Sequence, residues 1–206
     1  MNLPKKDKNG NGYLSYSQLS LFKRDKTAYF EQYIIGKPFE GNEYTEFGSN
    51  VGKALETNNF EKFTKNEAGI LQKVTRLDEF ERRTMLKFDE FYVVGYIDTN
   101  TKCLDEIIDY KTGGLRKEKQ YSDNDYTQLH LYALSLRQET GVTPTKASVE
   151  FIRRGGNAYR GEKLVVANEE PIKINIDISY DRLKDVYYDT IRTAKEIDQF
   201  YKTNLK

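Results

Sequence analysis

The sequence predicts an α/β domain in which helices flank a central mixed β-sheet. Amphipathic helical patterns occupy both the beginning and the end of the chain. Between them lie apolar runs of strand length that are rich in Val, Ile, Tyr and Phe. The elements follow in the order helix, helix, three strands, helix, strands and helix, which is typical of helices packed on a mixed sheet.

The N-terminal segment is polar, and residues 1–13 are expected to form a flexible leader before a single domain over residues 14–206. Four residues have the spacing of ligands and glycine in an EF-hand calcium loop: Asp7, Asn9, Asn11 and Gly12. The twelfth loop position is Gln18, whose neutral amide cannot supply the bidentate carboxylate, and Pro4 leaves no room for an entering helix. We therefore interpret these residues as a polar turn.

Two helices are expected before the first strand of the sheet. In residues 16–36 apolar side chains recur at roughly helical spacing, and Gly36 supplies the end. These side chains are Leu19, Phe22, Tyr29, Phe30 and Tyr33. A second helix is expected from about Gly48 to Phe63.

The strands and later helices follow from periodicity. Residues 80–88 and 91–98 are predicted to be two strands joined by a tight turn, with a third strand over 103–111. The next predicted elements are a helix over 125–141 and a strand over 146–154. Isoleucines alternate from 172 to 178, which indicates a strand with one buried face. Ser179 can then cap a long helix with one apolar stripe, formed by Leu183, Val186, Tyr187, Ile191, Ala194 and Ile197.

Bulk composition excludes several classes of protein. The net charge is +1, so a global basic field for nucleic acid is absent, although a local basic groove is compatible with it. The lone cysteine, Cys103, excludes a disulfide framework or an all-Cys iron–sulfur site, and it is expected to be a small buried residue. The N-terminus lacks a signal-peptide core, and the apolar run 91–97 is too short to span a membrane. We expect a cytoplasmic protein of a bacterium or a phage-infected cell.

Two acidic residues and a lysine fall on neighbouring predicted strands. Asp98 ends one strand, and Asp109 and Lys111 lie two residues apart on the next, so their side chains project from the same face. Mg²⁺ takes one or two protein carboxylates and leaves positions for water and phosphate, and a lysine beside it can orient the attacking water. The pattern indicates metal-dependent phosphodiester chemistry, whereas an isolated D-x-K pattern would equally fit a solvated strand edge.

At this point the sequence resembles a known group. The segments GYID (95–98) and IIDYKTG (107–113) are similar to the core of the PD-(D/E)XK nuclease superfamily, in its RecB-like and phage-exonuclease branch. Further segments agree in order: residues 14–36 with the first helix, residues 47–56 with the second, and Gln128 and Tyr132 with the Q-x-x-x-Y helix. The resemblance implies a restriction-endonuclease-like core and a DNA nuclease, with an exonuclease of recombination, repair or phage DNA metabolism as its expected form.

The resemblance also implies roles for individual residues. Asp98 and Asp109 would bind the metal, Mg²⁺ or Mn²⁺, and Lys111 would serve the nucleophilic water. The backbone carbonyl of Tyr110 and the side chain of Glu56 would be further ligands. A recombination or annealing protein and a homo-oligomer are the partners that relatives suggest besides DNA.

Gln128 and Tyr132 would position the lysine or a DNA phosphate, because they lie one helical turn apart on one face. Packing or capping against the sheet is the alternative for this pair. His130, two residues from Gln128, faces elsewhere and is expected to be a structural or surface residue.

The chain departs from the family pattern in two places. Many relatives carry a His one turn before the acidic helix residue, where this chain has Gly52. Several relatives carry a four-Cys iron–sulfur cluster that begins near the position of Asp25, and no such cluster is expected here. The first departure keeps open a rival function, a nuclease-like module that binds DNA or protein without cutting.

DNA contact is expected from a loop that follows the predicted catalytic strand. Residues 112–124 are glycine-rich and basic, which suits contact with a scissile strand. The residues expected to contact DNA there are Arg116, Lys117 and Lys119.

Overall fold

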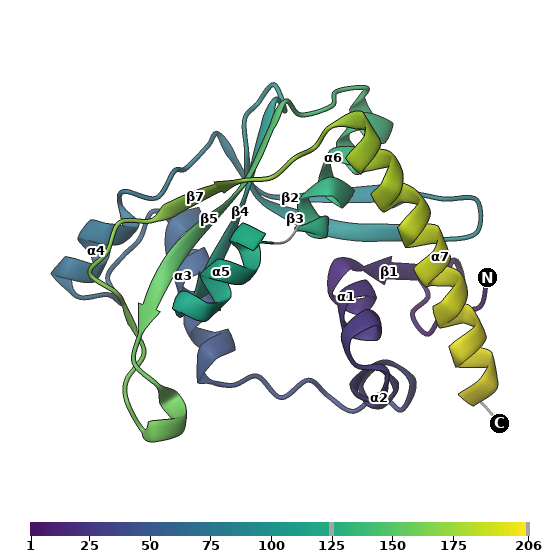
Figure 1. Cartoon of the computed structure of the whole chain (residues 1–206), viewed down its shortest axis with the longest axis horizontal. Coiled ribbons are helices and arrows are strands. Elements are labelled where there is room, and N and C mark those ends of the chain that lie inside the picture. The colour runs from purple at the N-terminus through teal and green to yellow at the C-terminus, as the bar shows by residue number, and fades with distance from the viewer. Residues whose placement is uncertain (124–125, 205–206) are drawn as a thin grey trace.

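The structure, a computed structural model, describes residues 1–123 and 126–204. The strands of this part form a seven-stranded mixed sheet with helices packed against it (Figure 1). The strands are β1 (Tyr13–Ser15), β2 (Glu79–Lys87), β3 (Tyr92–Asn100), β4 (Glu106–Gly113), β5 (Lys146–Gly155), β6 (Val165–Val166) and β7 (Ile172–Asn175). The helices are α1 (Tyr16–Arg24), α2 (Lys26–Tyr29), α3 (Glu43–Thr57), α4 (Lys65–Leu71), α5 (Leu115–Asp123), α6 (Thr127–Thr140) and α7 (Tyr180–Asn204). The predicted fold class is confirmed.

Strand β3 has partners on both edges. Along one edge β2 pairs with it antiparallel from Glu79↔Asn100 to Lys87↔Tyr92. On the other edge β1 pairs parallel with the beginning of β3, and β4 pairs antiparallel with its end. The described β3–β4 ladder consists of Thr99↔Ile108 and Asn100↔Ile107, and it ends where Asp98 and Asp109 would form the next pair. Beyond β4 the sheet continues through a parallel ladder with β5, which in turn pairs antiparallel with β6 and β7.

Three apolar clusters hold the helices to the sheet. The first joins α1, α2 and α7 to β1 and β3, around residues such as Phe22 and Tyr29. The second lies beneath α6 and includes Ile97 and Ile107 of the central strands. The third joins α3 and α4 to the end of β5 through Leu55 and Ile152. Each of the three clusters contains buried side chains from the sheet. The helices therefore pack directly on the strands and hold them in place.

The first thirteen residues pack on the domain instead of forming the expected flexible leader. Leu3 is fully buried in the first cluster, and Lys6 and Gly12 form a β-bridge. The carboxylate of Asp7 accepts hydrogen bonds from the backbone N–H groups of Asn9 and Asn11, at 2.8 and 2.9 Å. The residues with calcium-loop spacing therefore form a turn that brings the chain back to begin β1.

The first expected helix is interrupted. Ser15 caps α1 by accepting from the N–H of Gln18, but Asp25 is extended (φ −154°, ψ 95°) and breaks the helix after Arg24. The side chain of Asp25 then caps the short α2. A π-helical turn over Phe30–Ile34 follows, and Gly36 (φ +82°) ends it as expected.

The second expected helix begins earlier and ends sooner than predicted. Asn42 and Thr45 form a capping box that starts α3 at Glu43, and Asn58 in the left-handed conformation (φ 54°) ends it. Residues near Phe63 precede a separate helix, α4, whose own capping box is formed by Thr64 and Glu67. Polar caps thus fix both helix boundaries, which the apolar pattern alone did not reveal.

The C-terminal half follows the predictions closely, with two corrections. Helix α6 ends at Gly141 (φ 78°) and α7 begins directly after Ser179, as predicted. The strand expected over 172–178 is shorter, because β7 ends at Asn175. Cys103 is exposed, not buried, because it lies in the turn between β3 and β4. None of the helices among the described residues is long and apolar enough to cross a membrane.

Candidate active site

Three acidic residues lie side by side across the middle of the sheet. Strand register places Glu81 of β2 opposite Asp98 of β3, because the pairs Phe80↔Thr99 and Arg82↔Ile97 lie on either side. The β3–β4 register places Asp98 opposite Asp109. Backbone pairing omits these positions. After the larger effect of burial, however, the charges of Asp109 and Glu81 both raise the pKa of Asp98, so the three carboxylates lie near one another where the β3–β4 ladder opens.

The opening between β3 and β4 is bridged by Asp98 itself. Its Oδ2 accepts a hydrogen bond of 2.6 Å from the backbone N–H of Tyr110. Burial and the nearby negative charge of Asp109 raise the pKa of Asp98 to about 7, and the charge of Lys111 and the Tyr110 hydrogen bond only partly oppose them. The carboxylate is therefore held in a position that disfavours its own charge.

Asp109 is fully buried and paired with Lys111. The ammonium Nζ of Lys111 lies 2.5 Å from Oδ2 of Asp109. Burial raises the pKa of Asp109 although Lys111 opposes it, and neither carboxylate oxygen accepts a hydrogen bond of good geometry within the described residues. Burial would lower the pKa of Lys111, but the charges of Asp109 and Asp98 outweigh it and raise the pKa. Lys111 is thus held as a cation at the carboxylates.

A cleft of about 400 Å³ opens over these residues, and we call it the carboxylate cleft. Its floor includes Asp98, Lys111 and Glu81, and one wall is the face of α3 that carries Gly52 and Glu56. Asp109 lies beneath Lys111 and does not line the cleft itself. The predicted residues Asp98, Tyr110, Lys111 and Glu56 are therefore brought together around one cavity.

Glu56 reaches the cleft as a partly exposed side chain. Its Oε2 lies 2.9 Å from the Nζ of Lys53, one turn earlier on α3. Its charge contributes to raising the pKa of Glu81, after the larger effect of burial, so the two carboxylates face each other. Gly52 lies one turn before Glu56, and a Cβ added there would meet no atom within 4 Å. At the position where many relatives carry a histidine, this chain therefore leaves open space at the cleft wall.

Helix α6 packs against β3 and β4 and carries a chain of side-chain hydrogen bonds. The hydroxyl of Tyr126 donates to Oε1 of Gln128, and Nε2 of Gln128 donates to the hydroxyl of Tyr132. Tyr132 is buried, and its ring lies so close to β3 that a Cβ on Gly95 would fall 2.4 Å from its Cε1. The glycine of the GYID segment thus leaves room for the tyrosine of the Q-x-x-x-Y helix.

Tyr126 connects this chain to the ion pair. Its ring centroid lies 5.4 Å from Nζ of Lys111, within the range of a cation–π contact. Its hydroxyl also helps to hold down the pKa of Asp109, whose largest shift is the upward one from burial. The edges of Tyr16 and Tyr121 pack against the Tyr126 ring, at centroid distances of 5.5 and 5.2 Å. The ion pair therefore rests on a buried aromatic floor.

Positive charge gathers along the cleft between α3 and α5, where the guanidinium of Arg154 lies over the ring of Tyr44 of α3. Lys117 and Arg154 line the cleft together with Lys111. The pKa of Lys117 is lowered by burial first and then by the charges of Arg154, Lys111 and Arg24. Cations that repel one another in this way are stabilised by an anion between them, which suits a phosphate backbone.

The other two expected DNA contacts lie elsewhere. Residues 115–123 form α5 instead of the expected glycine-rich loop, since the glycines end at Gly114 and good helix formers follow. Arg116 and Lys119 are exposed on this helix but do not line the carboxylate cleft, whereas Lys117 does.

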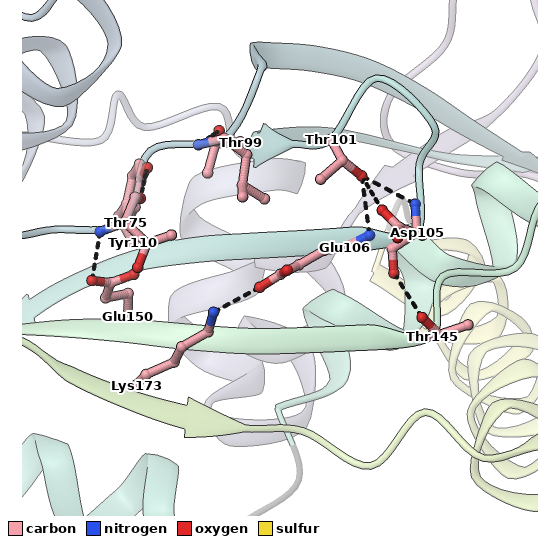
Figure 2. Close-up of polar contacts among 10 residues, drawn as sticks. Thr75, Thr99, Thr101, Asp105, Glu106, Tyr110, Thr145, Glu150 and Lys173 are labelled. Carbon is pink, nitrogen blue, oxygen red and sulfur yellow. Dashed lines mark hydrogen bonds and ion pairs between the residues drawn. The ribbon is translucent and has the colours of Figure 1, made fainter.

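The side chains of Tyr110 and Glu106 anchor β4 to neighbouring segments (Figure 2). The hydroxyl of Tyr110 donates to the carbonyl oxygen of Thr75 at 2.6 Å, and the N–H of Thr75 donates to Oε1 of Glu150 at 2.7 Å. Further along β4, Glu106 accepts from Nζ of Lys173 at 2.6 Å. These contacts hold the side chain of Tyr110, whose backbone carbonyl is a predicted metal ligand.

The donor set suits a divalent cation that prefers oxygen. Asp98 is partly buried at the cleft and Asp109 is fully buried, and their charges repel each other. Among the described residues no group of three or more His, Cys, Asp or Glu side chains is arranged to hold a metal ion. Mg²⁺ requires no such group, because it binds through one or two carboxylates and keeps water in its remaining positions.

His130, expected to be structural, is buried away from the cleft. Its two ring nitrogens lie 3.1 Å from the carbonyl oxygen of Tyr126 and 2.7 Å from that of Asp177. These contacts tie the beginning of α6 to the segment before α7, which is a structural role.

Sequence reasoning missed two members of the site. Glu81 could have been found from the predicted hairpin, since counting back from a tight turn at Asp89–Glu90 pairs Glu81 with Asp98. It is also one of three described non-glycine residues with positive φ (51°). Tyr126 carried no signal, because it lies at the start of the predicted helix over 125–141 and outside the Q-x-x-x-Y motif; in the structure it directly precedes α6.

Comparison with known proteins identifies the family and agrees with the fold. The sequence profile of the PD-(D/E)XK nuclease superfamily matches residues 59–200. The crystal structure of a candidate exonuclease from Eubacterium rectale is similar over 94% of this chain and 83% of its own, with a TM-score of 0.59 and 12% identity. The structure of SSO0001 matches 91% of this chain and 78% of its own, at 15% identity and a TM-score of 0.43. A search of curated proteins gave no match.

The profile match covers more than half of the chain and includes β3, β4 and α6, which carry Asp98, Asp109, Lys111, Gln128 and Tyr132. The similarity to the first structure agrees with it at the level of the fold. The chain therefore belongs to the PD-(D/E)XK nuclease superfamily.

Proposed function

We propose that this chain is a metal-dependent deoxyribonuclease, and in particular an exonuclease of DNA recombination, repair or phage DNA metabolism. The observation that carries the proposal is the convergence of Asp98, Asp109 and Lys111 at one end of a cleft that basic side chains also line. The superfamily supports phosphodiester hydrolysis, and the structural neighbour described as a candidate exonuclease supports the finer assignment.

Asp98 and Asp109 are the proposed ligands of Mg²⁺ or Mn²⁺, with the carbonyl of Tyr110 and the side chain of Glu56 beside them. A divalent cation held there would polarise the scissile phosphodiester and lower the pKa of a bound water. Two carboxylates whose charges disfavour each other bind such a cation more readily than two isolated ones.

Lys111 is the proposed donor to the scissile phosphate. Because neighbouring carboxylates hold it as an ammonium, it is suited to orient water and to offset negative charge that develops on the phosphorane. Water would attack in line, and the bond to the 3′ oxygen would break, which leaves a 5′-phosphate. Gln128 and Tyr132 would keep the catalytic strands in register from below.

Incubation of the purified protein with end-labelled linear DNA and with circular DNA, each with Mg²⁺, Mn²⁺ or EDTA, tests the proposal. We expect metal-dependent loss of linear DNA from its ends. Discrete fragments from circular DNA would instead identify a site-specific endonuclease. Asp109→Ala and Lys111→Ala are expected to abolish cleavage without unfolding the protein, and wild-type rates in both variants would refute the site.

A non-catalytic module that binds DNA or protein is the second candidate. The observation in its favour is Gly52, which leaves the cleft wall without the histidine found in many relatives. Absence of cleavage with either metal, together with retained DNA binding, would establish this alternative.

A further inference from the structure

Tyr159 is a tyrosine held almost entirely in solvent. Its side chain is 86% exposed, the largest exposure among the large hydrophobic residues of the described part of the chain. It lies in the loop between β5 and β6, which projects from the sheet on the side of α3 and α5, far from α7 (Figure 1). A fully exposed aromatic side chain loses little by being replaced, so its surroundings decide what it can bind.

The loop holds Tyr159 in a fixed position. A 3₁₀ turn over Ala158–Arg160 is capped by Asn157, whose Oδ1 accepts from the N–H of Tyr159 at 3.1 Å. At its base, Gly156 has φ +82°, and a Cβ there would fall 2.1 Å from the carbonyl oxygen of Lys163. The close backbone approach and the cap give the ring a rigid support rather than a free tip.

Tyr159 is joined to the carboxylate cleft by two further side chains. Its ring centroid lies 5.3 Å from that of Tyr44, and the hydroxyl of Tyr44 donates to Oδ1 of Asn157. The guanidinium of Arg154 lies 4.2 Å from the Tyr44 ring centroid. Tyr44 and Arg154 line the same cleft as Asp98 and Lys111. We call Tyr44, Arg154 and Tyr159 the tyrosine platform.

We propose that the tyrosine platform stacks an unpaired base of the DNA strand that enters the carboxylate cleft. The inference rests on the proposed nuclease function, and it names single-stranded DNA, or a single-stranded end, as the form of substrate that the cleft receives. An aromatic ring beside an arginine is the arrangement by which proteins bind single strands without regard to sequence. Bases within a duplex are already stacked on both sides and present no free face to Tyr159.

The surroundings favour a nucleotide over a protein partner. Apart from the ring of Tyr44, the loop residues that flank Tyr159 in sequence are mostly polar or charged: Asn157, Arg160, Glu162 and Lys163. One ring in a polar setting makes no apolar patch of the kind that a protein interface requires. A strand with one base on Tyr159 would place its phosphates toward Arg154 and Lys117, the cations of the cleft.

The absence of tryptophan from the chain provides a direct test. Tyr159→Trp introduces a single fluorescent indole at the platform, and Tyr188→Trp, at a residue 60% exposed on α7, is the matched control. Each variant is titrated in EDTA with single-stranded oligothymidylate and with a blunt duplex of the same length. We expect the single strand to quench Tyr159→Trp and to leave Tyr188→Trp unchanged. Equal quenching of both, or none of Tyr159→Trp, would overturn the proposal.

Affinity provides a second measurement that does not depend on fluorescence. Tyr159→Ala is expected to weaken binding of the same single-stranded oligonucleotide by about fivefold or more, the lower end of what loss of a stacking ring costs. Tyr159→Phe, which keeps the ring, should bind as the wild type does, and so should Tyr188→Ala. Unchanged affinity in Tyr159→Ala would contradict stacking at this ring.

The two proposals fail separately, because binding in EDTA requires no cleavage. If the wild type cleaves DNA and substitutions of Tyr159 have no effect on binding, the platform proposal is refuted and the nuclease proposal stands. If single strands quench the fluorescence of Tyr159→Trp but the wild type cleaves DNA with neither metal, the nuclease proposal is refuted and the DNA-binding surface stands.

Discussion

Oδ2 of Asp98 accepts the backbone N–H of Tyr110 at 2.6 Å, at the place where strands β3 and β4 stop pairing through their backbones. At this position the N–H of β4 therefore donates to a side-chain carboxylate, where a regular ladder would offer a backbone carbonyl. The same carboxylate lies between Glu81 and Asp109. The fold therefore needs Asp98 as a hydrogen-bond acceptor but is not stabilised by its negative charge. A substitution that keeps the acceptor and removes the charge separates the two.

The metal-free protein is expected to lose stability as the pH rises. The folded-state pKa of Asp98 is about 7, whereas an aspartate in an unfolded chain has a pKa near 3.8, so the folded state binds the proton more tightly between those values. The stabilisation is complete below pH 4 and is lost as the pH passes 7. Urea unfolding in EDTA at pH 5 and pH 8 should show it, on the order of 3 kcal/mol.

Asp98→Asn isolates this contribution, because the amide oxygen still accepts from Tyr110 and cannot titrate. The loss between pH 5 and pH 8 should be smaller in the variant than in the wild type. The same pH dependence in both proteins would show that Asp98 is not the titrating group.

A divalent cation should reverse the loss of stability at high pH. At pH 8 most of Asp98 is charged beside Asp109, so binding of Mn²⁺ should raise the melting temperature of the wild type. At pH 5.5 protons compete with the metal, and the shift should be smaller. Differential scanning fluorimetry with and without Mn²⁺ measures both. Asp98→Asn should show little shift at either pH, and an undiminished shift would place the metal elsewhere.

The Asp109–Lys111 pair should be strongly coupled. Lys111→Met leaves a fully buried carboxylate without its cation, which should cost about 2–4 kcal/mol of unfolding free energy at pH 8. The double variant Asp109→Asn/Lys111→Met removes both charges and should recover most of the loss. Urea denaturation of the four proteins in the cycle measures the coupling, and additive effects would mean that the pair is not an energetic unit.

Much of this site could be predicted because strands alternate. The two-residue spacing of Asp109 and Lys111 fixed their common face, whereas Asp98, expected to end its strand, lies within β3, which continues to Asn100. Boundaries set by polar side chains were missed, as at Asn42, where a capping box starts α3 five residues before Phe47. The basic loop was mistaken because its composition did not distinguish a helix from a turn.

Other features depend on contacts between segments far apart in the sequence. The exposure of Cys103 follows from its place in a turn, and nothing in its neighbours distinguishes that from burial. Tyr126 reaches Lys111 because α6 crosses beneath β4, a packing arrangement that no local pattern encodes. Local periodicity therefore predicted strands β3 and β4 but not the aromatic side chains, such as Tyr126, that pack against them.

Tyr126 should act on catalysis through position. Tyr126→Phe keeps the ring under Lys111 but removes the hydroxyl that donates to Gln128. We expect kcat to fall by about tenfold, as for other partners of metal ligands, with little change in KM because the residue is 7% exposed. Tyr13→Phe, at a ring stacked on Tyr92 away from the cleft, is the control. A rise in KM with unchanged kcat would instead make Tyr126 a DNA contact.

Gly52→His should strengthen metal binding. Gly52 lies on the cleft wall one turn before Glu56, and a side chain there meets open space. The added imidazole can reach toward Asp98, and the helix also gains because glycine is an unfavourable interior residue. We expect the affinity for Mn²⁺, measured by calorimetry, to rise about tenfold, which is ~1.4 kcal/mol.

Gly69→His separates these two gains, since Gly69 is also helical and unobstructed but lies on α4, outside the cleft. It should share any gain in helix stability and leave Mn²⁺ affinity unchanged. If Gly52→His binds Mn²⁺ no more tightly than the wild type, the metal is not held at this wall, and the role of Glu56 as a ligand falls with it. If affinity rises, the geometry of the cleft accommodates the histidine of the wider family, and Gly52 leaves a metal site that is weaker but intact.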